Sequence, residues 1–287
     1  MLRIDNLTKT YGSFKMNISM EVTPGSIVGI IGPNGAGKST AFKSILQLIR
    51  PESGSINLFG TEIGVAGEKM NTEMKNRIGV VFSDSGFSGY LNGKDVRNIL
   101  KNMYKDFEEE KFDNYCRQLN IPMDKKLKEF STGMKAKMRV IAALTHKADF
   151  LILDEPTAGL DVLARDEILD ILREYMAEKD DRCILISSHI SSDLENLCDE
   201  LYMIKSGEIV LHEACDVLLS DYAILKVSEE EYGKIDKEHI LRRRKENYGY
   251  MCMVRERRYY MENYPGIVIE KSSIDDLIQM MIKGENV

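Results

Sequence analysis

Short apolar runs alternate with helical stripes of apolar residues through most of the chain. Residues 26–31, 150–153 and 183–187 are mostly apolar, and each run predicts a strand that is buried on both faces. After the first run, apolar side chains recur at every third or fourth position over 42–49, which predicts one face of a helix. A second stripe, over 168–172, follows the middle run. Buried strands that alternate with helices are typical of a doubly wound α/β sheet.

Two other patterns surround this predicted sheet. Residues 2–7 and 17–22 alternate apolar and polar positions, so we expect an antiparallel pair of strands at the start of the chain. A further short strand is expected at 77–82. Between residues 93 and 147 the pattern changes to helical stripes. The sequence therefore predicts N-terminal antiparallel β strands and a mainly helical subdomain beside the central sheet.

The end of the chain, residues 216–287, follows a separate pattern that predicts a small C-terminal α/β appendage. The expected strands are 223–227, 249–254 and 266–269, and the expected terminal helix carries apolar residues from Ile274 to Met281. Four consecutive basic residues, 242–245, favour a solvated helix face. A contact with a membrane surface or with a partner is the alternative interpretation of this basic run.

One glycine-rich loop gives the clearest chemical signal, because it follows the first buried strand and opens the first helix. Its nine residues are Gly32, Pro33, Asn34, Gly35, Ala36, Gly37, Lys38, Ser39 and Thr40. They fit the pattern G-x-x-x-x-G-K-[ST], in which backbone N–H groups and a helix N-terminus bind nucleotide phosphates. We expect Lys38 to reach the β- and γ-phosphates and the Ser39 hydroxyl to bind Mg²⁺. A glycine-rich surface turn is the alternative, and the flanking strand and helix disfavour it.

Two carboxylates, Asp154 and Glu155, come directly after the second buried strand. The carboxyl ends of parallel strands are where ligands bind in a doubly wound sheet. We therefore expect Asp154 to hold Mg²⁺ and Glu155 to orient or deprotonate the water that attacks the γ-phosphate. A solvated acidic pair is the alternative, and the phosphate loop in the same chain disfavours it.

Three further residues are candidates on weaker grounds. Ser131 precedes a helical stripe, where it predicts a helix N-cap. His189 ends the third buried strand, so it either has a structural role or contacts the γ-phosphate. Tyr11 lies on the connection between the first two strands, where it either packs at a strand edge or stacks on a purine base.

Together these features resemble the ATP-binding cassette of ABC transporters over residues 1–215. The resemblance rests on six motifs in the family's order: Tyr11 as the adenine-stacking aromatic, the phosphate loop, the signature loop at 131–135, the Walker B strand at 151–154 with Glu155 after it, the D-loop that ends at Asp161, and His189 as the switch histidine. It implies a P-loop NTPase fold of the ABC type, with ATP and Mg²⁺ as ligands and ATP hydrolysis as the activity.

The resemblance also implies that one chain cannot complete the reaction. In the family, two cassettes close head to tail over two ATP molecules. The signature loop of one cassette, here Ser131 and the Gly133 N–H, binds the γ-phosphate that the other cassette holds. Closure and hydrolysis then drive a multi-span membrane partner, here expected to be an exporter. The second cassette is an identical copy or a related chain, and the expected location is the cytoplasmic face of the cell membrane.

Two departures from the family pattern concern the loops around the nucleotide. Ser83 stands where the family has a glutamine that contacts Mg²⁺ and senses the membrane domain. Asp84 is the nearby residue that could replace the glutamine as a metal ligand. In the signature loop, Thr132, Met134 and Lys135 replace the commoner residues, while Ser131 and Gly133 remain. We expect the γ-phosphate contacts to survive these changes.

Charge and composition narrow the classes of function. With 46 acidic and 39 basic residues, the net charge is −7, which argues against nucleic acid as a partner. The five cysteines are scattered and predict reduced thiols in a cytosol. No signal peptide and no apolar run of membrane-spanning length is recognised, so we do not expect the chain to cross a bilayer by itself.

Two other classes of protein stay open at this point. One is a soluble ABC-type ATPase that acts in assembly or regulation without transport. The other is a regulatory sensor that binds ATP without turnover, which Ser83 mildly favours and which Glu155 and His189 argue against. The single phosphate loop disfavours a ribosome-type protein with two cassettes in one chain, and the lack of sustained heptads disfavours a DNA-repair cassette.

Overall fold

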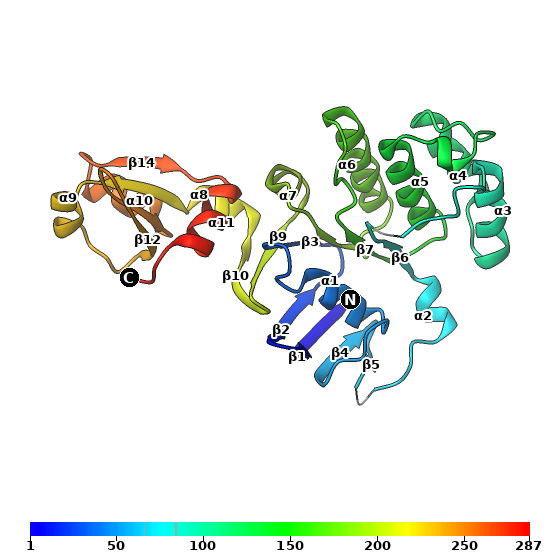
Figure 1. Ribbon diagram of the computed structural model, residues 1–287, viewed down its shortest axis with the longest axis horizontal. Coiled ribbons are helices and arrows are strands. Elements are labelled where there is room, and N and C mark those ends of the chain that lie inside the picture. Colours follow the sequence, from blue (N-terminus) through cyan, green and yellow to red (C-terminus); the bar gives the residue numbers. More distant parts are fainter. Residues whose placement is uncertain (66, 84) are drawn as a thin grey trace.

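The computed structural model describes residues 1–65, 67–83 and 85–287. Ten strands form the larger of its two sheets (Figure 1). They are β1 (Leu2–Tyr11), β2 (Phe14–Val22), β3 (Ile27–Ile31), β4 (Ser53–Leu58), β5 (Thr61–Ile63), β6 (Ile78–Val81), β7 (Phe150–Asp154), β8 (Cys183–Ser187), β9 (Glu200–Lys205) and β10 (Glu208–Ala214). Their order across the sheet is β5-β4-β1-β2-β10-β9-β3-β8-β7-β6.

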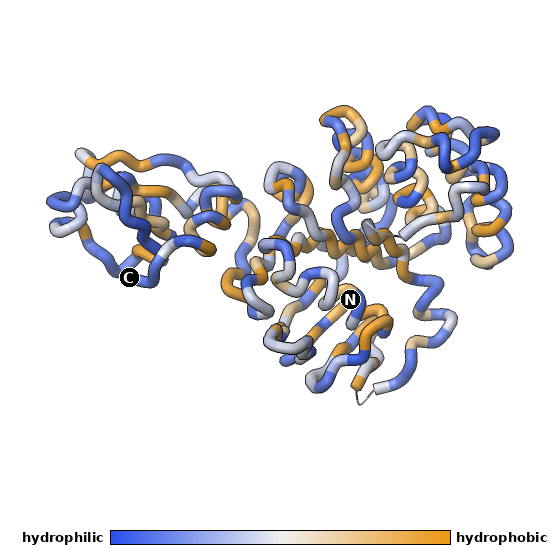
Figure 2. The backbone as a smooth tube through the Cα atoms, in the orientation of Figure 1, coloured by the Kyte–Doolittle hydropathy of each residue, from blue (hydrophilic) through white to orange (hydrophobic). Residues whose placement is uncertain are grey.

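Four neighbouring strands, β3, β8, β7 and β6, are parallel and form the centre of the fold. The residues of β3, β7 and β8 are buried on both faces, as the continuous apolar runs predict, whereas Val80 of the edge strand β6 is 36% exposed. In β7, for example, Leu151 and Leu153 belong to one apolar cluster, whereas Phe150 and Ile152 belong to the cluster on the opposite face. Figure 2 shows these strands as the hydrophobic centre of the molecule. Parallel strands bring their carboxyl ends to one edge of the sheet, so the loops that follow them meet there.

Helices cover both faces of this parallel region. They are α1 (Lys38–Ile45), α2 (Thr72–Asn76), α3 (Gly93–Met103), α4 (Glu109–Gln118), α5 (Thr132–Leu144), α6 (Val162–Ala177) and α7 (Ser191–Leu197), with a 3₁₀ turn at Leu127–Glu129. Helices α5, α6 and α7 share one apolar cluster, and α1 packs with β1, β2 and β4 on the other side (Figure 1). The helical subdomain expected between 93 and 147 corresponds to α3, α4 and α5. Among the helices described, none combines the length and the apolar character of a membrane span.

The predicted N-terminal pair is present, but its strands are longer than expected. Strands β1 and β2 pair antiparallel from Leu2 opposite Val22 to Tyr11 opposite Phe14. Tyr11 is therefore the last residue of β1, not a residue of the connection. Phe14 faces it across the hairpin end. The extended pairing places two aromatic side chains at the end of the hairpin.

The C-terminal segment forms a second, antiparallel sheet in the order β12-β13-β11-β14 (Figure 1). Its elements are α8 (Cys215–Ser220), β11 (Ala223–Val227), α9 (Glu229–Lys234), β12 (Ile240–Glu246), β13 (Gly249–Val254), α10 (Arg257–Asn263), β14 (Val268–Lys271) and α11 (Ile274–Lys283). The expectations for 223–227 and 249–254 match β11 and β13, and the third strand begins two residues later than expected.

The interpretation of residues 242–245 as a helix face is wrong, because these residues belong to strand β12. They pair with β13, and Arg243 lies opposite Cys252. The Arg243 guanidinium donates to the Tyr232 hydroxyl at 3.1 Å and lies 5.6 Å from the Tyr250 ring centroid. Consecutive basic residues show no apolar period, so only the pairing of the folded chain reveals the strand.

Helix α11 connects the second sheet to the first through α7. Leu277 of α11 and Leu194 of α7 belong to the same apolar cluster. The Glu195 carboxylate accepts the Ile274 N–H at 2.8 Å, which satisfies a free donor at the start of α11. The Lys205 ammonium donates to the Met281 carbonyl at 3.0 Å at the other end of the helix. The division of the chain at residue 215 stays a prediction, since the two sheets share an apolar cluster.

Truncating Leu277 to alanine is expected to lower the free energy of unfolding by about 2–5 kcal/mol, the usual range for a buried leucine. Leu277 is 2% exposed between α11 and α7, so its loss leaves a cavity there. Urea unfolding followed by circular dichroism measures the change. Met261→Ala, at a 52% exposed position of α10, is the control and should stay within about 0.5 kcal/mol. An unchanged midpoint for Leu277→Ala would contradict the packing of α11 on α7.

Candidate nucleotide-binding site

The phosphate loop leaves the carboxyl end of β3 and runs into α1, as the sequence predicts. Gly37 stands at the start of the helix with φ of 118°, a conformation that side-chain-bearing residues rarely adopt. A Cβ at Gly32 would lie 2.1 Å from the Ile204 carbonyl oxygen. Glycine is therefore required at both positions, and the loop backbone can follow this tight path only without side chains there.

The Lys38 side chain folds back over the loop. Its ammonium donates to the carbonyl oxygen of Gly32 at 2.6 Å and lies 3.4 Å from that of Pro33. Lys38 is only 7% exposed. Across the described residues, no carboxylate lies within ion-pair distance of this ammonium. A nearly buried positive charge that has only neutral carbonyl partners favours an anionic ligand.

A cavity of about 370 Å³ opens over this loop. Its lining residues come from the hairpin, the phosphate loop and the ends of β6 and β7: Phe14, Asn34, Gly35, Ala36, Gly37, Lys38, Ser39, Thr40, Ser83, Asp154 and Glu155. Gly32 and Pro33 are not among the lining residues, but their carbonyl oxygens hold the Lys38 ammonium. The cavity thus unites the loop with both carboxylates, which lie more than a hundred residues later in the sequence.

Asp154 is a buried carboxylate at the end of β7, with 4% of its surface exposed. One of its oxygens accepts the Ser39 hydroxyl at 2.7 Å, and the other accepts the Ser187 hydroxyl at 2.6 Å. Hydroxyl and carboxylate oxygens are the ligands that Mg²⁺ prefers, usually completed by phosphate oxygens. Ser39 and Asp154 therefore suit a magnesium ion that arrives with a nucleotide.

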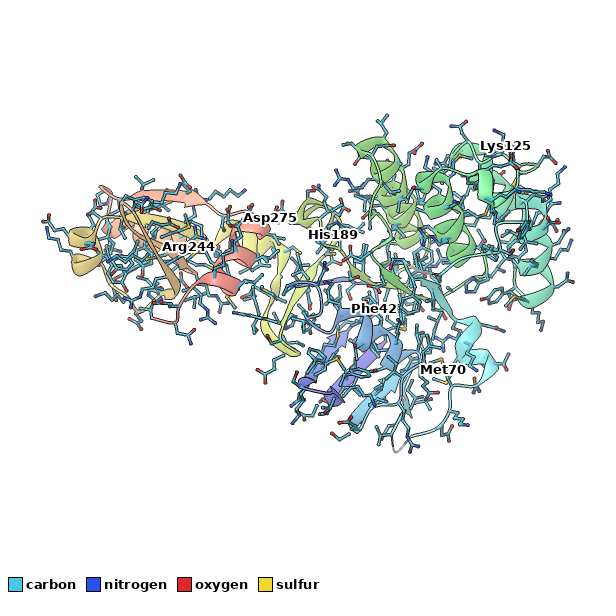
Figure 3. All side chains as sticks on the ribbon, in the orientation of Figure 1. Phe42, Met70, Lys125, His189, Arg244 and Asp275 are labelled. Atoms are coloured by element: carbon cyan, nitrogen blue, oxygen red, sulfur yellow. The ribbon has the colours of Figure 1, made fainter. Side chains whose placement is uncertain are left out.

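Glu155 and His189 are in direct contact. The Glu155 carboxylate accepts the His189 backbone N–H at 3.1 Å and lies 2.5 Å from the imidazole Nδ1. An ionised carboxylate only accepts, so Nδ1 carries the proton in this contact. The backbone of Glu155 has φ of 54°, which is uncommon outside glycine and is held by a bond from its N–H to the Ser187 carbonyl at 3.1 Å. Figure 3 shows His189 in the central part of the molecule, at the larger sheet.

The residues predicted for the signature loop and the D-loop, Ser131, Gly133 and Asp161, lie outside the described lining of the cavity. Ser131 is the N-cap of α5, as predicted, and its hydroxyl accepts the Met134 N–H at 3.1 Å. Gly133 follows in the first turn of that helix. Asp161 caps α6 by accepting the Ala164 N–H at 2.9 Å. The structure of one chain therefore does not bring Ser131, Gly133 or Asp161 to its own phosphate loop.

The loop after β6 brings Ser83 into the cavity. The Arg139 guanidinium, from α5, donates to the Ser83 carbonyl at 2.7 Å and to the Phe82 carbonyl at 3.0 Å. Burial lowers the pKa of Arg139. Asp84, the other residue considered for the metal, lies outside the described residues. The contacts of Arg139 therefore join helix α5, which follows Ser131, to the loop that carries Ser83.

Three residues of the site escaped the sequence analysis. Phe14, rather than Tyr11, is the aromatic residue that lines the described cavity, and Tyr11 is 48% exposed beside it. Ser187 bonds Asp154 from the neighbouring strand, and the polar end of the run at 183–187 is the only sequence signal for it. Arg139 has no sequence signal, because its partners lie more than fifty residues away.

Comparison with known proteins places these features in a family. The chain matches the ABC transporter family over residues 16–158. It is 32% identical over 214 residues to the bacitracin transport ATP-binding protein BcrA of Enterococcus faecalis, covering 73% of this chain and 68% of that protein. It is 33% identical over 219 residues to the lantibiotic transport ATP-binding protein SrtF of Streptococcus pyogenes, covering 75% and 92%.

Solved structures show the same fold. One is cbiO1 of Clostridium perfringens, described as part of an ABC transporter complex, with 29% identity and a TM-score of 0.63 over 75% of this chain and 88% of that chain. Another, the ATP-binding subunit of an ABC transporter, has 24% identity and a TM-score of 0.67 over 81% and 93%. The matches in sequence and fold agree, and the chain belongs to the family of ABC transporter ATP-binding proteins.

Proposed function

We propose that this protein binds and hydrolyses ATP to power a separate membrane-spanning partner, and that the complex is an exporter. The observation that carries the proposal is the cavity that combines the phosphate loop, Asp154 and Glu155. Relatives named for the transport of bacitracin and of a lantibiotic support a transport role. This arrangement provides for phosphate binding, metal binding and activation of water in one place.

The nucleotide is oriented by the hairpin at one end and the phosphate loop at the other. Tyr11 and Phe14 pair across the hairpin end and offer aromatic faces for the adenine base. The loop N–H groups and the N-terminus of α1 bind the phosphates. Lys38, now held by the Gly32 carbonyl at 2.6 Å, turns its ammonium to the β- and γ-phosphates.

The Ser39 hydroxyl and the Asp154 carboxylate would hold Mg²⁺, and the ion would supply positive charge next to the phosphates. Ser187 keeps the second Asp154 oxygen in place through its 2.6 Å bond. Ser83 lines the same cavity but carries only one hydroxyl, where the family has a longer amide side chain. We propose that the main role of Ser83 is to transmit binding of the membrane partner, through the bond between its carbonyl and Arg139, and not to bind the metal.

Glu155 is the proposed general base. Its carboxylate orients the attacking water and takes its proton as the water oxygen bonds to the γ-phosphorus, while the bond from that phosphorus to the β–γ bridging oxygen breaks and ADP leaves. His189 holds that carboxylate through both its backbone N–H and its Nδ1. With the proton on Nδ1, Nε2 donates to a γ-phosphate oxygen only when the ring is doubly protonated. The two residues therefore act as a pair in which His189 fixes the direction of Glu155.

A second cassette completes the site in this proposal. Ser131, Gly133 and Asp161 lie outside the described lining of the cavity in their own chain, and in this proposal they serve the nucleotide of the second cassette. The N-terminus of α5 offers N–H groups and a partial positive charge for a γ-phosphate. The partner cassette is a second copy or a related chain.

The membrane partner is proposed to bind beside Ser83. A groove of about 470 Å³ lies between the loop after β6 and helix α5, with Phe87, Met138 and Lys135 among its lining residues. Tyr90, 76% exposed, stands on the same loop. A groove with an exposed aromatic side chain beside it suits a protein partner, because tyrosine offers both an apolar ring and a polar hydroxyl. Binding there would place the cassette on the cytoplasmic face of the membrane.

Light scattering of a Glu155→Gln variant tests the proposal. The variant should be monomeric without nucleotide and should reach twice the monomer mass in excess MgATP, because it binds ATP but cannot hydrolyse it. Ser131→Ala in the same background should weaken this dimer. A Glu155→Gln protein that stays monomeric at saturating MgATP would argue against a dimer of identical chains and would direct the search to a related second chain.

A further inference from the structure

A buried carboxylate outside the nucleotide cavity connects two parts of the catalytic machinery. Asp193 lies in the first turn of α7 and is 2% exposed. One of its oxygens accepts the Thr157 hydroxyl at 2.6 Å. The other lies 3.5 Å from the Arg165 guanidinium of α6. Asp193 therefore joins the loop after β7, helix α6 and helix α7 at a single point.

Each of the three segments joined there carries a residue of the proposed mechanism. Thr157 follows Glu155 by two positions, and Asp193 follows His189 by four. Arg165 lies in the first turns of α6, whose N-cap is Asp161. The contact thus links segments that lie next to Glu155, Asp161 and His189 in the chain.

The loop after β7 depends on such a contact. Within it, the Ala158 N–H donates to the Glu155 carbonyl at 3.2 Å and the Leu160 N–H to the Thr157 carbonyl at 3.3 Å. These turn contacts shape the loop but do not attach it to α7. Glu155 also has the uncommon φ of 54°, and such a backbone persists only where its surroundings hold it.

Burying a carboxylate is unfavourable, and it raises the pKa of Asp193, which the Thr157 hydroxyl bond and Arg165 oppose. An apolar side chain would fill the same place without that penalty. The carboxylate is best explained by the specific direction of its bonds to Thr157 and Arg165, which an apolar contact could not provide.

We propose that Asp193 is a positioning residue, which attaches the loop that follows Glu155 to helix α7, two residues after His189, through Thr157. It contacts neither nucleotide nor metal in this proposal. It acts by keeping the Glu155 carboxylate and the His189 imidazole in their relative positions during turnover. The inference rests on the proposed ATPase function. Comparing each variant with the wild-type chain distinguishes a failure of the positioning role from a failure of the ATPase function.

The matched pair Thr157→Val and Thr157→Ser tests the contact in the full-length protein. Valine keeps the shape and removes the hydroxyl, whereas serine keeps the hydroxyl. We expect Thr157→Val to lower kcat at least about tenfold, since small displacements of catalytic groups have large effects on rate. The Kd for ATP should be unchanged, because the phosphate loop is untouched. Thr157→Ser should restore kcat to within about twofold of the wild-type value.

Asp193→Asn provides a second variant of similar volume, which keeps an acceptor for Thr157 but removes the charge beside Arg165. We expect it to lower kcat less than Thr157→Val does. A lower melting temperature with unchanged kcat in both variants would show a structural role only and would overturn the proposal.

Amide hydrogen exchange tests whether Asp193 attaches the loop to α7, and it does not depend on ATPase activity. In Thr157→Val, the peptide that covers residues 155–161 should exchange faster than in the wild type, while the phosphate loop should exchange at the same rate. If the wild-type chain shows no turnover, the ATPase function fails, and this measurement still tests the attachment. Unchanged exchange over 155–161 would overturn it.

Discussion

Replacing Glu155 with glutamine is expected to lower kcat for ATP hydrolysis by roughly 10²- to 10⁴-fold, the usual contribution of a general base. Glutamine retains an oxygen that can accept from His189, so the local geometry should survive. It cannot take a proton from water. The Kd for ATP should stay within about threefold, because Lys38 and the phosphate loop are unchanged. Steady-state phosphate release and equilibrium ATP binding measure the two quantities separately.

Glu174→Gln is the matched control for this prediction. Glu174 is an exposed residue of α6, away from the cavity, and its replacement removes the same charge. It should leave kcat within about twofold, as surface substitutions usually do. If Glu155→Gln turned ATP over at the wild-type rate, Glu155 would not be the base, and the contact with His189 would have to serve another purpose.

Replacing Lys38 with methionine is expected to weaken ATP binding by about 2–3 kcal/mol, or roughly 30- to 160-fold in Kd. Methionine keeps most of the length of the side chain and removes its charge. Lys38 is almost buried and is held in the loop by neutral carbonyls, so its ammonium is available for phosphate oxygens. A methionine cannot donate to them or neutralise them. Titration calorimetry with a nonhydrolysable ATP analogue measures the loss.

Lys94→Met is the control for the lysine variant. Lys94 lies in α3, far from the cavity, and forms an exposed ion pair with Asp124 at 2.6 Å. Its replacement should leave the Kd for ATP unchanged, since exposed pairs contribute little. Wild-type affinity in Lys38→Met would mean that the nucleotide does not use the phosphate loop as proposed.

The parts of the site that the sequence predicts well are contiguous in the chain. The phosphate loop is one stretch of nine residues, and its strand and helix are its immediate neighbours. Asp154 ends strand β7 and Glu155 directly follows it. The continuous apolar run of that strand indicates that it is buried on both faces. The strand or helix that positions each of these motifs is adjacent to it in the sequence, so it can be predicted together with the motif. The family resemblance then indicates that the motifs belong to one site.

The parts that sequence analysis missed depend on contacts between distant segments. Ser187 bonds Asp154 only because β8 lies beside β7. Arg139 reaches the Ser83 loop across the interface between α5 and β6. Strand β12 is defined by its pairing with β13 and has no apolar alternation of its own. No local pattern encodes these relations, so they become visible only in the folded chain.

Capture of membrane proteins by the tagged chain tests the central claim most directly. The chain would be expressed in its source cells and purified from detergent-solubilised membranes, with Phe87→Asp in the groove and Met261→Asp on α10 as matched variants. We predict that a multi-span membrane protein co-purifies in comparable amount with the wild type and with Met261→Asp, and is lost with Phe87→Asp. Recovery of soluble proteins alone, or of no partner, would contradict the transporter account.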